Sequence, residues 1–412
     1  MKCRFCEAET GEPVLSLGTQ PLANSFLDAE EVRAIETGHR GETRRPLDLH
    51  LCTACGLVQI AETVHPETMF SDYIYVSGTS DLIHRHAAVL VELAREVIGE
   101  LGGAPVVEIA SNDGTVLRRF REAGARVLGV EPARNVATLA EAAGIPTRVE
   151  FFSAAAGRDI ARAFGHARLL LARHVFAHVP APRDVLEGAR EVIGRDGILM
   201  IESPYLEPFL TRTEFDTIYH EHLAYLSARP IARLLDGLGL ELFDVRPFDI
   251  HGGSMLYVIG ARGAHAVRPA VPALLAREKE LGLAERPVWE AFAARADAIR
   301  TRLAALLEEL GGSGARLAGY GAPAKGNTLL GCLDGGWKHL RFLVDRSPWK
   351  QGRFTPGTHL PVRPPQALLD EGIDHTLLLA WNFETEILEQ QAEYRRRGGR
   401  FLRPIPWPEV IA

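Results

Sequence analysis

The sequence has no apolar run long enough to cross a membrane. The best candidate, residues 169–180, is interrupted by Arg173, His174 and His178, whereas a membrane-spanning helix needs roughly 18 or more apolar residues in a row. The first residues also lack the apolar segment of a secretory signal, since Cys3 and Cys6 follow almost at once. We therefore expect a soluble, cytoplasmic protein with no membrane partner.

The sequence also lacks an excess of positive charge and any low-complexity segment. Its 412 residues carry 46 basic and 53 acidic side chains, which gives a formal net charge of −7. Neutralising nucleic-acid phosphates requires a basic surface, so we expect no nucleic-acid partner. The 39 glycines and 25 prolines are spread along the chain. A globular chain of this length usually forms two or three domains.

Cysteine is scarce, and four of the five cysteines form one pattern. Cys3 and Cys6 are separated by two residues, as are Cys52 and Cys55. Two such pairs can surround one ion with four thiolates, the ligand set of structural Zn²⁺. A pair of disulfides is the alternative, which a cytoplasmic location disfavours. Four thiolates leave no position for water, so the ion should stabilise the fold, and Cys332 should be a buried apolar residue.

The order of predicted strands and helices indicates an α/β protein. A strand, a glycine-containing turn, a helix and a second strand follow one another over residues 105–131 and again over 315–345. This is the βαβ pattern of doubly wound parallel sheets. A long helical region, 271–310, connects the two units. We expect a zinc-binding domain over 1–70, a Rossmann-like domain over 71–265 and a second Rossmann-like domain over 266–412.

The first glycine turn has the features of a nucleotide-cofactor site. Ligands of open α/β sheets bind beyond the carboxyl ends of the strands, where Ala110 and Gly114 would admit a ligand close to the backbone. Glu131 ends the next strand and is placed to accept both hydroxyls of a ribose. The turn lacks the G-x-G-x-x-G pattern, and Asp113 would repel a pyrophosphate. These features favour S-adenosylmethionine over NAD.

The second glycine turn, residues 319–324, does match G-x-G-x-x-A after a strand. Asp345 ends the next strand, and Lys325 stands beside the turn. Backbone N–H groups at the start of a helix, together with one ammonium group, can hold a diphosphate. We favour the diphosphate of a nucleotide other than NAD. NAD itself and a tight turn without a ligand are the alternatives.

A crowded run of titratable side chains over 219–225 predicts an acid/base site. Its members are Tyr219, His220, Glu221, His222 and Tyr225. Histidine titrates near neutral pH, a carboxylate can orient it, and a tyrosine can donate to a developing oxyanion. Metal binding by His220 and His222, or a surface turn without a function, are the alternatives. His178 follows the predicted strand at 169–172 and should reach the same cleft.

Together these segments resemble the S-adenosylmethionine-dependent C-methyltransferases that act on nucleotide-linked keto-deoxysugars. The best-known type of this family methylates C-3′ of a dTDP-4-keto sugar. The resemblance runs nearly end to end, although many relatives have Asn residues where this chain has Arg173 and His174. The segments that carry it are the two cysteine pairs, 21–26, 72–78, 108–114, 129–132, the loop of His178, 219–222, 251–254, 319–327 and 345–358.

The resemblance implies a zinc-binding N-terminal domain, a central methyltransferase domain and a C-terminal Rossmann-like domain without NAD. It also implies a reaction in which a base removes the proton next to the 4-keto group and the resulting enolate carbon takes the methyl group. The implied base is His222, oriented by Glu221, and Tyr219 is implied on the enolate oxygen. The residues implied to assist are His178 and either Tyr73 or Tyr75.

The resemblance further implies two sets of binding residues. The cofactor set is Glu108, Ala110, Asn112, Asp113, Gly114, Glu131, Pro132 and His174. The sugar-nucleotide set is Tyr75, His251, Gly253, Ser254, Tyr320, Lys325, Asn327, Arg346, Lys350 and Arg353.

The expected substrate is a dTDP-linked 4-keto-6-deoxy sugar of a secondary-metabolite or surface-glycan pathway, such as deoxysugar or antibiotic biosynthesis. A GDP-linked keto sugar is an alternative substrate. An NAD-dependent sugar-nucleotide oxidoreductase and a zinc-scaffolded binding protein without activity are alternative functions. We expect a monomer, with a dimer as the alternative.

Overall fold

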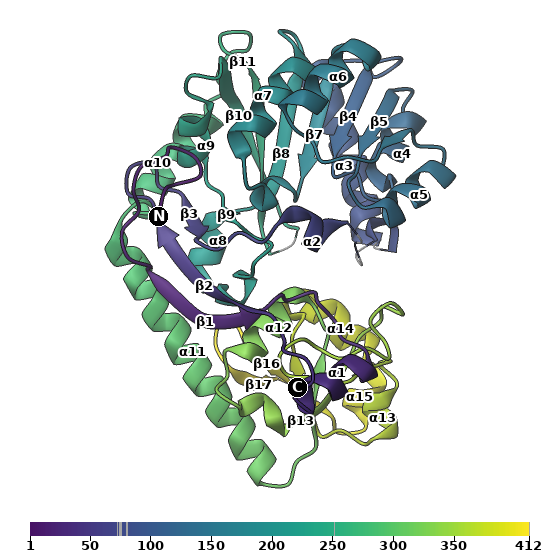
Figure 1. The fold of residues 1–412 in the computed structure, drawn as a ribbon, viewed down its shortest axis with the longest axis vertical. Helices are drawn as coiled ribbons and strands as arrows, with labels where there is room; N and C mark the ends of the chain where they lie inside the picture. The colour runs from purple at the N-terminus through teal and green to yellow at the C-terminus, as the bar shows by residue number, and fades with distance from the viewer. Residues whose placement is uncertain (72, 74–75, 80, 251, 412) are drawn as a thin grey trace.

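In the computed structural model, the described residues (1–71, 73, 76–79, 81–250 and 252–411) form three β-sheets with helices around them (Figure 1). The first sheet is antiparallel. Its order is β1 (Leu15–Pro21), β2 (Arg44–Leu51), β3 (Val58–Ile60) and β9 (Ala224–Tyr225). Because β9 comes from the middle of the chain, backbone hydrogen bonds tie the N-terminal segment to the segment that follows His222.

The second sheet has seven strands in the order β10-β11-β8-β7-β4-β5-β6. Their bounds are β4 (Pro105–Ile109), β5 (Arg126–Val130), β6 (Thr147–Arg148), β7 (Leu169–Arg173), β8 (Ile198–Pro204), β10 (Leu240–Phe248) and β11 (Ser254–Ala261). The strands from β8 to β6 are parallel, and β10 and β11 are antiparallel at one edge. The predicted doubly wound sheet is confirmed.

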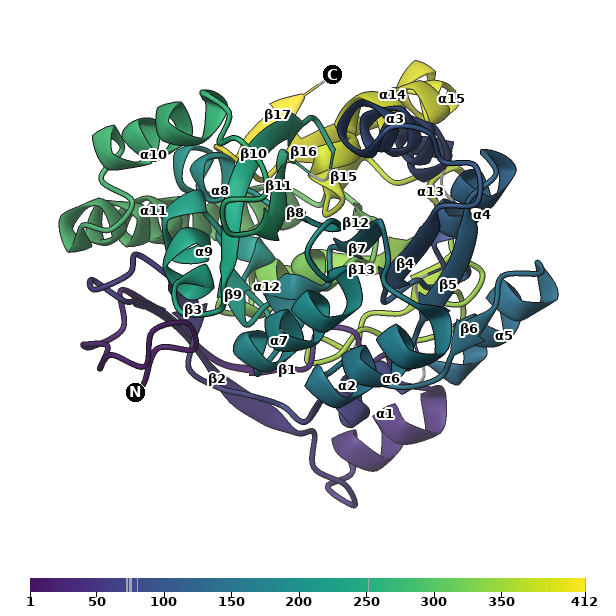
Figure 2. The same cartoon turned by 90° about the horizontal axis from the view of Figure 1, so that it is seen from above.

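Helices cover both faces of this sheet because its central strands are apolar on both sides. Successive side chains of a strand point to opposite faces. On β4, Val107 belongs to one apolar core with α6 (Ala154–Phe164) and α7 (Pro182–Ile193), and Val106 belongs to another with α3 (Asp81–Ile98) and α4 (Thr115–Glu122). Figure 2 shows α6 and α7 on one face of the sheet and α3 and α4 on the other.

The third sheet has six strands in the order β14-β13-β12-β15-β16-β17, of which only β17 is antiparallel to its neighbour. The strands are β12 (Leu317–Tyr320), β13 (Leu340–Val344), β14 (Val362–Arg363), β15 (His375–Leu378), β16 (Arg400–Arg403) and β17 (Glu409–Ile411). The second predicted βαβ unit is confirmed, and its helix α12 (Ala324–Gly331) begins directly after Pro323.

The helical connector predicted over 271–310 is two helices, α10 (Ala270–Glu280) and α11 (Arg286–Gly312). The chain turns between them at Gly282, whose φ of +66° favours glycine. Pro287 then stands in the first turn of α11, where its missing N–H costs no hydrogen bond. Apolar side chains of α11 share one core with the first and third sheets, so this helix joins the two (Figure 1).

The remaining helices are short. They are α1 (Ala29–Glu36), α2 (Pro66–Phe70), α5 (Arg134–Ala142), α8 (Leu206–Thr211), α9 (Ala228–Leu235), α13 (Ala367–Asp370), α14 (Glu384–Gln390) and α15 (Ala392–Arg396). Among the described residues, no helix combines the length and the apolar character needed to span a bilayer. Cys332 is buried, as predicted.

A cavity of about 810 Å³ lies where the second sheet meets the third. One wall consists of residues at or just beyond the carboxyl ends of β4, β5, β7 and β8, and the opposite wall includes 323–325 at the start of α12. Ligands of open parallel sheets bind at this edge. The cavity is therefore the candidate active site.

Candidate active site

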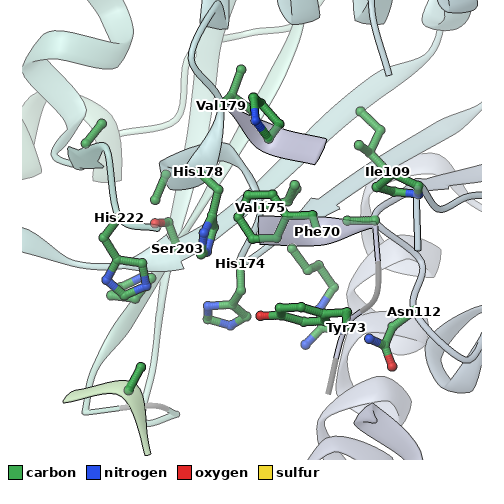
Figure 3. A pocket seen from close by; sticks show the side chains of 18 of the residues that line it. Phe70, Tyr73, Ile109, Asn112, His174, Val175, His178, Val179, Ser203 and His222 are labelled. Atoms are coloured by element: carbon green, nitrogen blue, oxygen red, sulfur yellow. The ribbon is translucent and has the colours of Figure 1, made fainter. Parts of the chain in front are cut away.

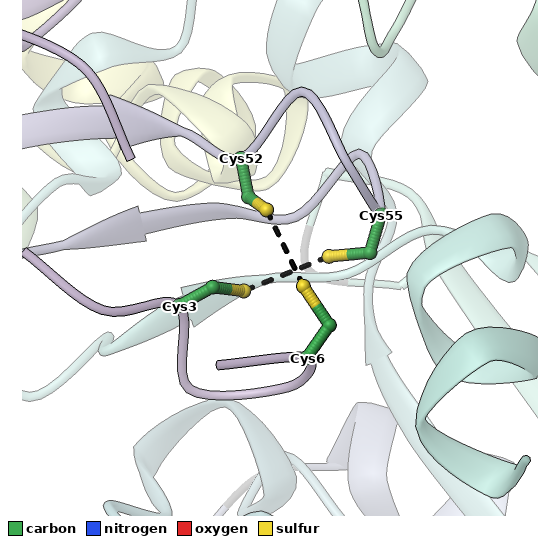
Figure 4. Close-up of side chains that lie close together, drawn as sticks. All are labelled: Cys3, Cys6, Cys52 and Cys55. Atoms are coloured by element: carbon green, nitrogen blue, oxygen red, sulfur yellow. Dashed lines mark hydrogen bonds between the residues drawn. The ribbon is translucent and has the colours of Figure 1, made fainter. Parts of the chain in front are cut away.

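The four paired cysteines lie together at the end of the first sheet (Figure 4). Their sulfur atoms all lie within 4.8 Å of one another, with 3.6 Å between Cys3 and Cys55 and 3.5 Å between Cys6 and Cys52. Tetrahedral Zn²⁺ with Zn–S bonds of about 2.3 Å would hold its sulfurs about 3.8 Å apart. Four converging thiols with this spacing fit structural zinc.

The cysteine cluster packs against the segment that carries one of the predicted catalytic histidines. Cys3, Cys52 and Cys55 share an apolar core with the second sheet, and the Phe5 ring contacts the Phe176 ring edge-on at 6.2 Å. Phe176 begins the short helical turn Phe176–His178. The zinc cluster therefore supports the turn that places His178 beside the cavity.

The cofactor end of the cavity is built from the turns after β4 and β5. Ala110 and Asn112 line the cavity with φ of +52° each, a conformation that is costly for residues with a Cβ and is concentrated at functional sites. The buried Glu131 carboxylate accepts the backbone N–H groups of Asn112 and Ala133, both at 2.9 Å. Each carboxylate oxygen has a second lone pair, so Glu131 can still accept ribose hydroxyls.

Glu108 adds an acidic group to the same end. It lines the cavity, and its buried Oε2 has no hydrogen-bond partner among the described residues. Burial raises the pKa of Glu108 to about 8, despite an Arg173 guanidinium 3.8 Å from its Oε1. A buried polar atom left unpaired indicates a missing partner. The unpaired oxygen of Glu108 and the Glu131 carboxylate together fit a ribose-containing cofactor such as S-adenosylmethionine.

Asp113 and Gly114 shape this end of the cavity without lining it. The Asp113 carboxylate accepts the Gly78 N–H at 2.9 Å and the Thr115 hydroxyl at 2.7 Å. Gly114 has a φ of +73°, and a Cβ at this position would lie 2.9 Å from the Ile145 side chain. The other predicted cofactor residues line the cavity, and they are Glu108, Ala110, Asn112, Glu131, Pro132 and His174.

The predicted base, His222, lines the cavity with both ring nitrogens hydrogen-bonded. Its Nδ1 lies 2.9 Å from the Thr217 carbonyl oxygen, and its Nε2 lies 2.7 Å from the Tyr219 hydroxyl. A carbonyl can only accept, so Nδ1 carries the proton and Nε2 accepts from Tyr219. Burial lowers the pKa of His222 to about 4 and raises the pKa of Tyr219 well above its usual value.

The prediction that Glu221 orients His222 is wrong. The Glu221 carboxylate accepts a hydrogen bond from Asn24 at 2.6 Å, and burial raises its pKa to about 7. The Thr217 carbonyl orients His222 instead. Sequence reasoning missed Asn24 and Thr217. The segment 21–26, which carried the family resemblance, contained the signal for Asn24, whereas a backbone carbonyl leaves no signal in the sequence.

Two further predicted residues, His178 and Tyr73, line the same cavity. His178 lines the cavity with its ring 5.0 Å from the His222 ring, and its buried Nδ1 has no hydrogen-bond partner in the described structure. Tyr73 also lines the cavity (Figure 3), whereas Tyr75 lies outside the described residues. His220 faces the first sheet, 3.1 Å from the Pro46 carbonyl. Among the described residues, the only potential metal cluster is that of the cysteines.

At the opposite end of the cavity, Lys325 is surrounded by polar groups. Its ammonium donates to the Asn382 amide oxygen and lies 3.8 Å from the centre of the Trp381 ring. Burial lowers the pKa of Lys325 to about 8, and the charges of Asp216 and Glu214 oppose that shift. Sequence reasoning missed these two acids, which would compete with a diphosphate for Lys325.

Of the other predicted sugar-nucleotide residues, those that the structure describes do not line the cavity. Tyr320 packs against Phe401, and Asn327 donates to the Ala23 carbonyl at 2.7 Å. Lys350 donates to the Ala322 carbonyl at 2.9 Å. Gly253 and Ser254 lie at the start of β11, Arg346 forms an exposed ion pair with Glu386, and Arg353 is exposed. His251 lies outside the described residues.

Comparisons with known proteins show the family of this chain. The chain is 39% identical over 412 residues to the C-methyltransferase NovU of Streptomyces niveus, which covers 100% of this chain and 97% of that protein. The chain belongs to this C-methyltransferase family. Three family models match it: "Putative zinc binding domain" over residues 3–70, "Methyltransferase domain" over 81–245 and "C-methyltransferase C-terminal domain" over 249–406. The predicted enzyme class is confirmed, and the predicted S-adenosylmethionine and structural zinc fit these matches.

Solved structures match this C-methyltransferase only in part. A magnesium protoporphyrin IX methyltransferase from Synechocystis PCC 6803 with bound S-adenosylmethionine is 12% identical, covers 43% of this chain and 79% of its own, and has a TM-score of 0.33. A SAM-dependent methyltransferase from Anabaena variabilis is 16% identical, covers 49% and 100%, and has a TM-score of 0.35. At such scores the likeness carries no functional information.

Proposed function

We propose that this C-methyltransferase transfers a methyl group to the carbon next to the ketone of a nucleotide-linked 4-keto-6-deoxy sugar, at C-3′ of a dTDP-linked sugar. The observation that carries the proposal is one continuous cavity of about 810 Å³. This cavity extends from the cofactor end, which contains Glu108 and Glu131, to a cluster of histidine and tyrosine side chains. The cluster consists of His174, His178, Tyr219 and His222. The relative from Streptomyces niveus is named a C-methyltransferase, which supports carbon as the methylated atom.

The ketone is a chemical requirement of this proposal. A sugar C–H bond without a neighbouring carbonyl is far too weak an acid for any side chain in the cavity. With a ketone beside it, a base can remove the proton and leave an enolate, which hydrogen-bond donors stabilise at its oxygen. S-adenosylmethionine, when bound, supplies an electrophilic methyl group.

Tyr219 and His222 are suited to the ketone oxygen. His222 is held in place through its Nδ1 by the Thr217 carbonyl, and it holds the Tyr219 hydroxyl at 2.7 Å. A hydroxyl that turns from His222 towards the substrate can donate to the enolate oxygen. His222 itself can take a proton at Nε2 only after that hydroxyl has moved away. With the Tyr219 hydroxyl turned to the substrate, the lone pair of His222 Nε2 is available for the role of base that the family resemblance implies.

The three proposed domains have different roles. Residues 1–70 would hold zinc against the turn of His178, and residues 71–265 would hold the cofactor and the reacting carbon. Residues 266–412 supply the opposite wall of the cavity, against which the nucleotide of the substrate would lie. The cytoplasmic location, the monomeric state and the role in deoxysugar or antibiotic biosynthesis stay predictions.

The proposal is tested by incubating the purified protein with S-adenosylmethionine and a dTDP-linked 4-keto-6-deoxyhexose. We expect a mass gain of one methyl group and a new carbon–methyl signal at C-3′ by NMR. The matched control is the same sugar with its ketone reduced to an alcohol, which should not react. A GDP-linked keto sugar tests the choice of nucleotide. Methylation of the reduced sugar, or of oxygen, would contradict the proposal.

A further inference from the structure

Tyr73 lines the cavity, and a side chain from outside the lining holds its backbone. The Tyr73 N–H donates to Asn135 Oδ1 at 3.1 Å, and Asn135 Nδ2 donates to the Tyr73 carbonyl oxygen at 2.8 Å. The two bonds engage both backbone polar groups of one residue, as a paired strand can. They also fix the orientation of the amide, because an N–H can only donate and a carbonyl can only accept.

Asn135 belongs to the cofactor side of the fold. It is the second residue of α5 and follows Glu131, whose carboxylate accepts the Ala133 N–H at 2.9 Å, by four positions. Asn135 is exposed and lies outside the cavity lining, whereas Glu131 lines the cavity. The turn after β5 therefore carries both the carboxylate of the cofactor end and the amide that holds Tyr73.

The turn after β4 holds neighbouring backbone groups in the same way. The Ser77 N–H donates to Asn112 Oδ1 and the Gly78 N–H donates to Asp113 Oδ2, both at 2.9 Å. A Cβ on Gly78 would collide with the Asp113 carboxylate, so this close approach requires glycine. Side chains from both turns of the cofactor end thus hold Tyr73, Ser77 and Gly78, which lie between α2 and α3.

The Tyr73 ring, in contrast, belongs to the reacting end of the cavity. It lies edge-on to the Phe70 ring at 5.9 Å, and the Phe70 ring lies edge-on to the His178 ring at 5.6 Å. The His178 ring lies 5.0 Å from the His222 ring. Burial, and then neighbouring charges that include Tyr73, raise the pKa of Tyr219 well above its usual value. Figure 3 shows the Tyr73 hydroxyl on the side of the histidine rings in that view.

The bonds between Asn135 and Tyr73 should affect placement more than folding. Both bonds are exposed to solvent, so water can replace them, and they contribute little to global stability. A catalytic group that is misplaced by about 1 Å can nevertheless cost about 100-fold in rate. Loss of the Asn135 amide should therefore leave the chain folded and move the Tyr73 ring.

We propose that Asn135 is a positioning residue of the methyl-transfer reaction, which holds the Tyr73 side chain at the reacting end of the cavity through the Tyr73 backbone. This inference rests on the proposed function. Because the same turn carries Glu131, it would place both the cofactor ribose and the Tyr73 ring. The turn after β5 thereby links the cofactor end of the cavity to the reacting end.

The experiment is a double-mutant cycle on methyl transfer by the full-length protein, with S-adenosylmethionine and the keto sugar nucleotide. Asn135→Ala removes both hydrogen bonds. We expect kcat to fall about tenfold or more, with the Kd for S-adenosylmethionine within about threefold of that of the unaltered protein. When Tyr73→Phe is already present, Asn135→Ala should lower kcat by less than about twofold, because the hydroxyl that it positions is gone.

Two further variants separate positioning from folding. Asn135→Gln keeps the amide on a side chain one methylene longer and should regain part of the lost kcat. The matched control is Thr138→Ala, at an exposed residue of α5 whose hydroxyl donates to the Arg134 carbonyl of the same helix, and it should leave kcat unchanged. Millisecond hydrogen exchange needs no substrate, and the Tyr73 amide should exchange about tenfold faster in Asn135→Ala.

Three results would each overturn the inference while leaving the proposed function intact. The first is a kcat of Asn135→Ala within about twofold of that of the unaltered protein. The second is an equal fold loss with and without Tyr73→Phe, and the third is unchanged exchange of the Tyr73 amide. If the unaltered protein methylates no keto sugar nucleotide, the proposed function and the role of Asn135 in it are both wrong. The melting temperature of each variant shows whether it has folded.

Discussion

The two glycine turns of this C-methyltransferase have the same internal hydrogen bonds. In the first unit, Glu131 follows β5, and its carboxylate accepts the N–H of Asn112 in the turn after β4. It also accepts the N–H of Ala133, two residues beyond Glu131 itself. In the second unit, Asp345 follows β13, and its carboxylate accepts the N–H of Ala322 in the turn after β12 at 2.7 Å. It also accepts the N–H of Ser347, two residues beyond Asp345 itself, at 2.8 Å. In both units, the acid at the end of the second strand fixes the turn after the first.

The two turns differ in the surroundings of the acid, which faces the cavity in the first turn and an ammonium group in the second. Glu131 lines the cavity. Asp345 is outside the described lining, with the Lys350 ammonium 3.9 Å away and bonded to the carbonyl of Ala322 in the turn. The second turn thus carries its own cation where a ligand would approach. A glycine pattern therefore indicates the shape of a βα turn, and the residues outside the pattern decide whether it binds a ligand.

The largest difference between the two turns should appear when the acids Glu131 and Asp345 are removed one at a time. Glu131→Ala removes the carboxylate that we propose accepts two ribose hydroxyls, at about 1.5 kcal/mol or more for each charged hydrogen bond. We expect the affinity for S-adenosylmethionine to fall about 100-fold. Asp345→Ala should change that affinity by less than about threefold. Isothermal titration calorimetry measures both, and equal losses would show that the two turns are not different in function.

A second test concerns the lysine at the start of α12. Lys325 donates to Asn382 and lies near Asp216 and Glu214, so Lys325→Met removes a positive charge that favours the ionised forms of both acids. Because this charge opposes the rise in the pKa of both buried acids, and one pKa unit corresponds to about 1.4 kcal/mol, we expect a loss of about 2 kcal/mol in the free energy of unfolding at pH 8, measured with urea.

The loss should shrink at lower pH. Burial raises the pKa of Asp216 to about 6 and that of Glu214 to about 7, so both acids become neutral as the pH falls and no longer need the cation. The matched control is Lys338→Met, at an exposed lysine 6.0 Å from the Trp337 ring. This substitution should leave the free energy of unfolding unchanged. If Lys325→Met instead left the stability unchanged and raised the KM for the sugar nucleotide about 100-fold, Lys325 would be a ligand of the substrate phosphates.

Features that depend on local spacing could be predicted from the sequence. The two cysteine pairs need only their own turns and one further contact to form a four-thiol site. The strands at β4, β5, β7 and β12 follow from short runs of apolar residues bounded by glycine turns. The break between α10 and α11 was missed although Gly282 and Pro287 mark it, because the surrounding residues all favour helix.

Features that depend on pairing across the fold could not be predicted. Thr217 orients His222 through a backbone carbonyl, which has no sequence signature. Glu202 reaches His174 from a neighbouring strand, and its only signal is an acid at the end of an apolar run. Asp345 and Lys350 each looked suited to a ligand when taken separately. Only their packing shows that they neutralise one another.

A third test uses the pH dependence of stability at the first turn. Burial raises the pKa of Glu108 from 4.5 to about 8, so folding favours its protonated form. Its contribution to stability is present below about pH 4.5 and is lost as the pH rises to about 8, with a slope of at most about 1.4 kcal/mol per pH unit. Glu108→Gln should remove this slope from urea unfolding curves recorded without cofactor. Glu141→Gln, at an exposed acid on α5, should keep it.

The smallest expected effect shows what the two turns share. Gly114 and Gly321 have φ of +73° and +87°, and a Cβ would lie 2.9 Å from Ile145 in the first and 2.8 Å from Ala380 in the second. Gly114→Ala and Gly321→Ala should therefore each lower the free energy of unfolding by about 1 kcal/mol, whereas Gly41→Ala, with open space around it, should not. Only Gly114→Ala should also weaken S-adenosylmethionine binding, because only the first turn borders the cofactor. Equal weakening by both alanines would mean that the second turn also shapes the cofactor site, despite the lysine that stands against its acid.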